Sequence, residues 1–239
     1  MTNIDTENPV IGISYSKAKC FYECKRRFMF KYIEKIPEQS NTYATRGNKI
    51  HKDIELFITN KSENPGDIHP DALSSILYYR NQYGAGSLYS EHKIERQFII
   101  GFNEFNYCGF IDILHKNTPS EWTVIDIKTG KERDFALQLN VYAYILFLNT
   151  PDLQKINGEV LYTQTGSKYS YEFFRDETLN TFRYLEETMS DMCNEKEYTH
   201  KESWLCRFCS YKKECDAINS RGKYIHVQNV RISKELFRK

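Results

Sequence analysis

The chain has 239 residues, the length of one ordinary domain, and carries 33 Lys and Arg against 32 Asp and Glu. The net charge of +1 excludes a uniformly basic nucleic-acid coat, and 40% hydrophobic residues are too many for a disordered chain. No apolar run approaches the ~20 residues that a membrane span needs, and residues 1–9 lack the pattern of a signal peptide. We therefore expect a soluble, cytoplasmic protein that does not bind membranes.

The first half of the chain reads as helices followed by strands. Apolar residues at helical spacing predict three helices, over residues 14–34, 45–59 and 71–83. The period then changes to two, which predicts strands over residues 92–102, 107–115 and 122–128.

The second half predicts a further helix, a hairpin and a long amphipathic helix, over residues 135–148, 159–174 and 176–194. We take residues 14–90 as an N-terminal helical part, 91–175 as the core and 176–220 as a C-terminal helix with a cysteine segment. A basic tail, residues 221–239, completes one domain. The order of elements predicts the α/β fold class, with a central mixed sheet flanked by helices.

Two charged residues end an otherwise apolar strand, Val124-Ile125-Asp126-Ile127-Lys128. Because positions i and i+2 of a strand share a face, Asp126 and Lys128 lie side by side and Ile127 faces the core. Asp112 stands alone in the preceding apolar strand. Two carboxylates on neighbouring strands are what a hard divalent cation needs, and such a cation activates water and binds a phosphate oxygen. The alternative interpretation is a buried Asp–Lys ion pair without a metal.

Helical residues add candidates to the same site. His51, in a helix that Thr45-Arg46-Gly47 opens, is a further candidate metal ligand, although a lone helical histidine is often only structural. Gln138 and Tyr142 are spaced i, i+4 and share one helical face. Glu95 either supports the site from the strand before or is a solvated strand residue.

In chain order these residues resemble the RecB-like nuclease branch of the PD-(D/E)XK superfamily. The resemblance is carried by Gly47-x3-His51, Gly109-x2-Asp112, Asp126-Ile127-Lys128 and Gln138-x3-Tyr142. It covers most of the chain and implies a PD-(D/E)XK core with metal-dependent deoxyribonuclease activity. It implies that Mg²⁺ or Mn²⁺ is held by His51, Asp112, Asp126 and the Ile127 carbonyl. Lys128 would be the catalytic lysine, and Gln138 and Tyr142 would support it or contact DNA.

Seven cysteines, an odd number, argue against a disulfide framework and point to metal or cluster binding. Cys206-x2-Cys209-x5-Cys215 places three thiols close together near the C-terminus. A fourth ligand is needed, and Cys20 and Cys24, at i and i+4 of the first helix, are both candidates. Cys108 and Cys193 are interpreted as packing residues.

The segment around Cys24 resembles the N-terminal cysteine segment of the iron–sulfur members of the RecB-like group. These members include the AddB-type helicase-nuclease subunits and the CRISPR-associated RecB-like exonucleases. The resemblance implies a 4Fe–4S cluster on Cys24, Cys206, Cys209 and Cys215 that joins the first helix to the C-terminal segment. A four-cysteine zinc site is the rival interpretation, because Zn²⁺ accepts the same ligands.

Two basic segments are candidate DNA contacts. Residues 17–35 hold seven basic and two acidic residues, and residues 221–239 hold six basic residues and one acidic residue. We expect them to contact the DNA backbone, and the alternative is a solvated helix face and a flexible tail.

The function expected is a metal-dependent DNA exonuclease, acting on single strands or free ends in repair, recombination or phage DNA processing. A bacterial, archaeal or phage-infected cell is the expected setting. The chain lacks a GxxxxGK[ST] phosphate loop, so a separate helicase or recombinase is a possible partner. A structure-selective endonuclease with the same site, and a silent DNA-binding adaptor, are the alternatives. The sequence leaves the oligomeric state open.

Overall fold

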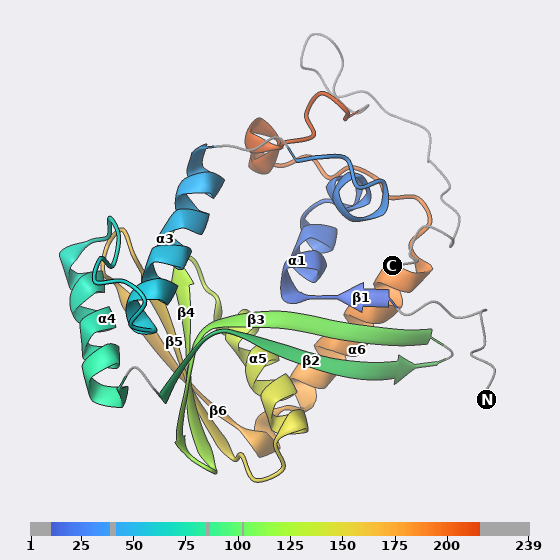
Figure 1. Ribbon diagram of the computed structural model, residues 1–239. Coiled ribbons are helices and arrows are strands. Elements are labelled where there is room, and N and C mark those ends of the chain that lie inside the picture. Colours follow the sequence, from blue (N-terminus) through green and yellow to red (C-terminus); the bar gives the residue numbers. More distant parts are fainter. Residues whose placement is uncertain (1–10, 39–41, 85–86, 102, 216–239) are drawn as a thin grey trace, which may run out of the picture. The chain divides into compact units, whose positions relative to one another are not determined.

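The computed structural model describes residues 11–38, 42–84, 87–101 and 103–215, and the chain divides into two compact units (Figure 1). We call residues 41–96 with 108–183 the sheet unit, and residues 1–40 with 97–107 and 184–239 the cysteine unit. Three elements contribute residues to both units, namely β2 (Leu88–Ile100), β3 (Asn103–Thr118) and α6 (Leu179–Asn194).

The sheet unit is built around β4 (Glu121–Lys128), whose six inner residues are all buried. β4 pairs antiparallel with β3 on one side and parallel with β5 (Lys155–Tyr162) on the other. β5 continues into an antiparallel hairpin with β6 (Lys168–Phe174). The apolar run of β4 is typical of a strand covered on both faces, and this position keeps water away from the carboxylate near its end.

Helix α5 (Ala136–Asn149) makes the crossover between the parallel strands β4 and β5. It is buried on almost every side, so its polar residue Gln138 also lies in the interior. Gly158 of β5 leaves room for this packing, because a Cβ there would lie 3.2 Å from Leu139 of α5 and 2.8 Å from the Phe173 ring. Helix and sheet therefore approach closely on the face that carries Asp126.

Helices α3 (Thr42–Ile58) and α4 (Pro70–Tyr83) cover the opposite face of this sheet. Their apolar residues form one buried cluster with residues of β3, β4 and β5, including Ile113, Ile125, Ile127 and Leu161. Ile127 therefore faces the core, as the alternation of β4 predicts.

The cysteine unit joins the two ends of the chain. Its N-terminal part comprises β1 (Ile11–Ile13), α1 (Tyr15–Glu23), α2 (Lys25–Phe28) and the π-helical turn η1 (Met29–Ile33). β1 pairs parallel with β3 at Phe105–Tyr107. Its C-terminal part includes α6 from Tyr184 onward and the short 3₁₀ helix η4 (Trp204–Phe208). Phe28 stacks on Tyr198, and the Arg26 N–H donates to the Thr199 carbonyl. The N-terminal helices and the C-terminal cysteine segment are therefore packed together, as expected.

The predicted fold class, a mixed α/β fold with a central mixed sheet flanked by helices, is confirmed. Several boundaries differ by a few residues, as in β3, which spans Asn103–Thr118 rather than residues 107–115, and two differences have a clear physical reason. The helix predicted over residues 14–34 is interrupted at Cys24, whose backbone is extended, with φ −165° and ψ 107°. The hairpin begins at Lys155 rather than residue 159, because Asn157-Gly158 has the composition of a turn but serves close packing inside β5.

A short additional element, 3₁₀ helix η3 (Arg175–Glu177), precedes α6.

No helix in the described ranges has both the length and the apolar character that a membrane crossing requires. The basic tail, residues 221–239, lies outside the described residues.

Candidate metal and catalytic site

Asp112 lies at the junction of β3, β4 and α3. Its Oδ2 accepts a hydrogen bond from the backbone N–H of Ile127 at 2.6 Å, and its Oδ1 lies 3.3 Å from His51 Nδ1. The two bonds fix both oxygens of the carboxylate. The antiparallel pairing of β3 with β4 makes this arrangement possible, because it sets Asp112 beside the strand that carries Asp126.

Asp126 is the centre of a second network. Its Oδ2 lies 2.6 Å from Lys128 Nζ, and its Oδ1 accepts from Gln138 Nε2 at 3.1 Å. Gln138 also accepts from Lys128 Nζ at 3.1 Å and donates to the Tyr142 hydroxyl at 2.8 Å. The i, i+2 spacing on β4 and the i, i+4 spacing on α5 therefore bring these four side chains together. Gln138 and Tyr142 are buried and contact the carboxylate network.

Burial dominates the electrostatics of Asp126, which is 3% exposed. Desolvation raises the pKa of its carboxyl to about 6, against the opposing effect of the Lys128 ammonium. Lys128 itself lies over the Phe135 ring, 4.4 Å from its centroid. A carboxylate held so far from water is stabilised by a bound cation more than an exposed one would be.

His51 reaches Asp112 because α3 approaches the end of β4 closely. A Cβ on Gly47, one turn before His51, would lie 2.9 Å from Thr129 Oγ1, so glycine allows the approach. Burial disfavours the charged imidazole, but the hydrogen bond and the attraction from Asp112 outweigh it and raise the pKa of His51. His51 and Asp112 thus form a paired acid and base at the edge of the site.

Glu91 of β2 is a residue that the sequence analysis missed. Its carboxylate, that of Asp112 and the His51 imidazole offer ligand atoms that all lie within 4.8 Å of one another. Burial and the Asp112 charge raise the pKa of Glu91. Glu95, the supporting acid considered from the sequence, instead pairs with Lys93 at the surface. Glu91 has φ 50°, a left-handed conformation inside a strand, and no sequence pattern at this position signals it.

The donor set fits a hard divalent cation. Among the described residues, the compact group of possible ligands is His51, Glu91 and Asp112, while the Asp126 carboxylate lies outside this group and is bonded to Lys128 and Gln138. Oxygen donors of this kind suit Mg²⁺ and Mn²⁺, and the imidazole also suits Mn²⁺. Such a cation lowers the pKa of bound water and stabilises charge on a phosphate.

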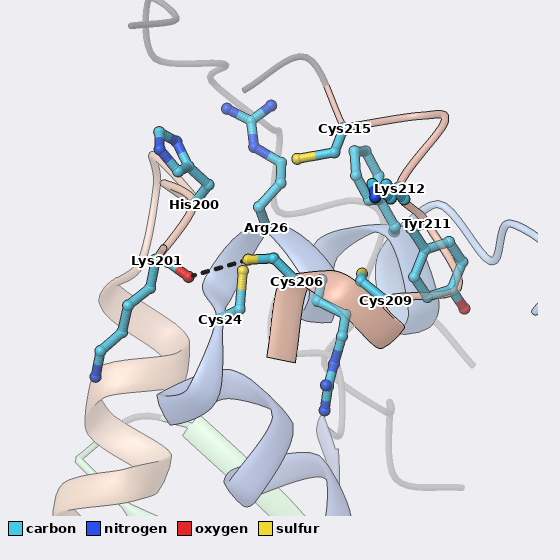
Figure 2. Close-up of a pocket in the computed structure, with 11 residues that line it drawn as sticks. Cys24, Arg26, His200, Lys201, Cys206, Cys209, Tyr211, Lys212 and Cys215 are labelled. Atoms are coloured by element: carbon cyan, nitrogen blue, oxygen red, sulfur yellow. Dashed lines mark hydrogen bonds between the residues drawn. The ribbon is translucent and has the colours of Figure 1, made fainter. Parts of the chain in front are cut away.

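Four cysteines line one small cavity in the cysteine unit (Figure 2). Cys24 enters from the break between α1 and α2, and the C-terminal segment contributes Cys206, Cys209 and Cys215. Figure 2 shows Cys206 Sγ close to the Lys201 carbonyl, to which it donates at 4.0 Å. These are the four cysteines that the family resemblance singles out.

Cys20 and Cys24, the two candidate fourth ligands, have different surroundings. Cys24 caps α1, where its N–H donates to the Cys20 carbonyl at 3.0 Å and its own backbone is extended. Cys20 is buried and accepts a hydrogen bond from Arg27 Nε at 3.3 Å, and it does not line the cavity. Of the two candidate fourth ligands, Cys24 is the one at the cavity.

The four thiols are the donor set that both a 4Fe–4S cluster and Zn²⁺ accept. Burial raises the pKa of the Cys209 thiol, against the opposing effects of the Tyr211 N–H and the Arg27 guanidinium.

Three of the seven basic residues of the first helical segment form ion pairs, and a fourth is buried. Arg26 is buried, Arg27 pairs with Glu23, Lys25 with Glu195 and Lys31 with Glu38. The expectation of an open basic face over residues 17–35 is therefore weakened.

Both the sequence and the fold of the chain resemble those of known proteins. The family described as "PD-(D/E)XK nuclease superfamily" matches residues 12–216. A solved structure titled "Crystal structure of SSO0001" is similar in fold, with a TM-score of 0.54 and 17% sequence identity over 89% of each chain. A comparison with curated protein sequences gives no match.

Proposed function

Because the chain belongs to the PD-(D/E)XK nuclease superfamily, whose members are metal-dependent nucleases, we propose that it is a RecB-like deoxyribonuclease acting on DNA ends or single strands. The observation that carries the proposal is the pair of linked networks around Asp112 and Asp126. One holds His51 and the other holds Lys128. We assign Asp112, Asp126, His51 and the Ile127 carbonyl as ligands of Mg²⁺ or Mn²⁺, with Glu91 as an added ligand.

Each residue then has a chemical role. Lys128 orients the attacking water or stabilises the charge that develops on the phosphate, from a position 2.6 Å from Asp126. Gln138 positions both groups, because its amide bonds Asp126 and Lys128 at once. Tyr142 positions Gln138 in turn. The cation, when bound, supplies a nucleophile at neutral pH and neutralises a phosphate oxygen.

The cysteine cavity supports a second part of the proposal. Cys24, Cys206, Cys209 and Cys215 line one cavity from the two ends of the chain, as a 4Fe–4S cluster on these residues requires. The resemblance of these four cysteines to those of the iron–sulfur RecB-like nucleases favours the cluster over zinc. The cluster would hold α2 to the C-terminal segment, so its role is structural.

The biological setting follows by analogy with RecB-like nucleases. We propose DNA repair, recombination or phage DNA processing, with a helicase or recombinase as partner and the cytoplasm as location. This part rests on the family alone.

Cleavage assays on matched substrates test the activity. The protein is incubated with linear single-stranded, linear double-stranded and circular DNA, with Mg²⁺, Mn²⁺ or EDTA. We expect metal-dependent degradation of linear DNA and intact circles. Cleaved circles would indicate the endonuclease, and the absence of any cleavage by a metal-loaded sample would contradict the proposal.

Lys128→Ala tests the mechanism, with Lys131→Ala as its control. Lys131 is an exposed lysine three residues later. We expect Lys128→Ala to lower the cleavage rate by about a thousandfold and Lys131→Ala to leave it within about twofold. Equal rates in the parent and Lys128→Ala would remove Lys128 from the chemistry.

A further inference from the structure

Two large aromatic side chains of the cysteine unit are exposed next to the cysteine cavity. Trp204 is 60% exposed and Phe208 is 75% exposed, at the two ends of η4. Their rings contact each other edge to face, with centroids 6.2 Å apart. Such rings are normally buried, so an exposed pair is a candidate binding surface.

The fold holds these rings outward. Cys206 and Cys209 of the same segment line the cavity, while the rings at positions 204 and 208 remain in solvent. Ser203 fixes the start of η4, because its side chain accepts from the Leu205 N–H at 3.3 Å. The rings are therefore presented by a short, anchored segment and lose little further freedom on binding.

Several exposed cations lie close in sequence to the aromatic pair. Lys201, Arg207, Lys212 and Lys213 are all exposed, against the two exposed acids Glu202 and Glu214. Within the described part of the chain, none of the four cations has a salt bridge. Three N-terminal cations of the same unit, Lys25, Arg27 and Lys31, are instead paired with glutamates. Residues 201–214 therefore carry four exposed cations against two exposed acids, close in sequence to Trp204 and Phe208.

We propose that Trp204 and Phe208 form a stacking platform for the bases of single-stranded nucleic acid, with these cations contacting its phosphates. Aromatic faces stack unpaired bases of any sequence, and the bases of a duplex are already stacked on one another. Charge complementarity favours a polyanion over a neutral or basic protein surface. The inference rests on the proposed function, and it adds that the DNA bound at this surface is single-stranded.

Tryptophan fluorescence tests stacking directly, because the chain has two tryptophans and Trp122 is buried. The Trp122→Phe variant, combined with Lys128→Ala to preserve the DNA, leaves Trp204 as the reporter. Oligo-dT, an abasic oligonucleotide of equal length and a blunt duplex are titrated separately. We expect strong quenching by oligo-dT and little by the abasic oligonucleotide, which has the same phosphates but no bases.

Affinity measurements separate stacking from charge. Trp204→Ala and Phe208→Ala should each weaken oligo-dT binding about tenfold, with an unchanged dependence on salt. Arg207→Gln should weaken binding and reduce the salt slope by about one phosphate contact. Trp204→Phe keeps a stacking face and should retain most of the affinity. Tyr78→Ala, which removes a 55% exposed ring of α4, is the control and should have no effect.

Several results would overturn the inference. The first is Trp204 fluorescence that stays unquenched at saturating oligo-dT. The second is an affinity for oligo-dT that neither alanine variant lowers. The third is a change in self-association or in protein binding alone, with DNA binding unchanged. Iron content and absorption near ~400 nm show whether each variant keeps the proposed cluster. If Trp204→Ala loses it, the DNA affinities of Trp204→Phe and Phe208→Ala decide whether the rings stack on bases. If Lys128-dependent cleavage persists while the aromatic variants bind normally, only the inference fails. If the parent neither binds nor cleaves DNA, the proposed function fails.

Discussion

The carboxylate site of the sheet unit and the cysteine cavity of the cysteine unit are organised in opposite ways. Protein hydrogen bonds fix the carboxylates of Asp112 and Asp126, with Ile127, Gln138 and Lys128 as partners. In the cavity, the Cys206 thiol reaches the Lys201 carbonyl only at 4.0 Å. The first site is thus preorganised by the fold, whereas the geometry of the second depends on what the thiols bind.

This difference has an energetic basis. Asp126 is a buried carboxylate that protein bonds hold in place at a cost in stability, and such an arrangement favours a bound cation. Cysteine side chains are weakly polar, so burying them costs much less than burying a carboxylate. Substitutions in the sheet unit should therefore abolish function while the fold survives, and substitutions in the cavity should loosen the cysteine unit.

The largest expected effect is that of Asp112→Asn. The amide keeps the size of the side chain but removes the negative charge that a divalent cation needs. We expect cleavage to fall by at least about a thousandfold. Circular dichroism should show the parent's fold, because the sheet does not depend on this charge. Cleavage at more than a tenth of the parent rate would contradict the assignment of Asp112.

The next effect concerns Cys206→Ser, with Cys108→Ser as the control outside the cavity. The proposed cluster would lose a ligand, so we expect loss of absorption near ~400 nm and a stability loss of at least about 2 kcal/mol. Hydrogen exchange should locate the loss in α2, η1 and η4, with β4 and β5 still protected. Equal loss of protection in β4 would contradict the comparison.

A smaller effect is expected at Glu91. Glu91→Gln should weaken Mn²⁺ binding about tenfold, because Glu91 lies within 4.8 Å of the ligand atoms of His51 and Asp112. Glu95→Gln is the matched control and should bind Mn²⁺ as the parent does. Titration of free Mn²⁺ by electron paramagnetic resonance measures both, and equal affinities for the two variants would exclude Glu91.

The smallest effect is a gain in stability from Asp126→Asn in EDTA. Burial raises the pKa of Asp126 to about 6 from an ordinary value of 3.8, so at pH 8 the folded protein holds an unfavourable charge. The contribution of this group to stability should increase as the pH falls from above 6 toward 4. Asp126→Asn should add about 1 to 2 kcal/mol at pH 8, less than the full shift because Lys128 loses its partner. Urea unfolding measures it, with the exposed Asp152→Asn as the control, and a clear loss of stability would contradict this account.

Strand alternation was sufficient to predict the core of the sheet unit. The i, i+2 rule places Asp126 beside Lys128 with Ile127 on the other face, and the structure has this arrangement. The antiparallel pairing of β3 with β4 brings Asp112 next to them. These features depend on local periodicity and on short connections, both of which are visible in a sequence.

Other features depend on backbone conformations that the sequence does not signal. Glu91 reaches the site from a left-handed position within β2, and alternation alone describes it as a surface residue. Cys24 reaches the cavity because the helix breaks there, and no glycine or proline marks the break. Tertiary packing decides both positions.

The most direct test of the central claim is to locate the divalent cation. Crystals soaked in Mn²⁺ would give anomalous scattering at the manganese position. We predict a peak at ligand distance from the proposed ligands, which are Asp112, Asp126, His51, Glu91 and the Ile127 carbonyl. A manganese peak elsewhere in a crystal whose carboxylates remain bound to Lys128 and Gln138 would contradict it.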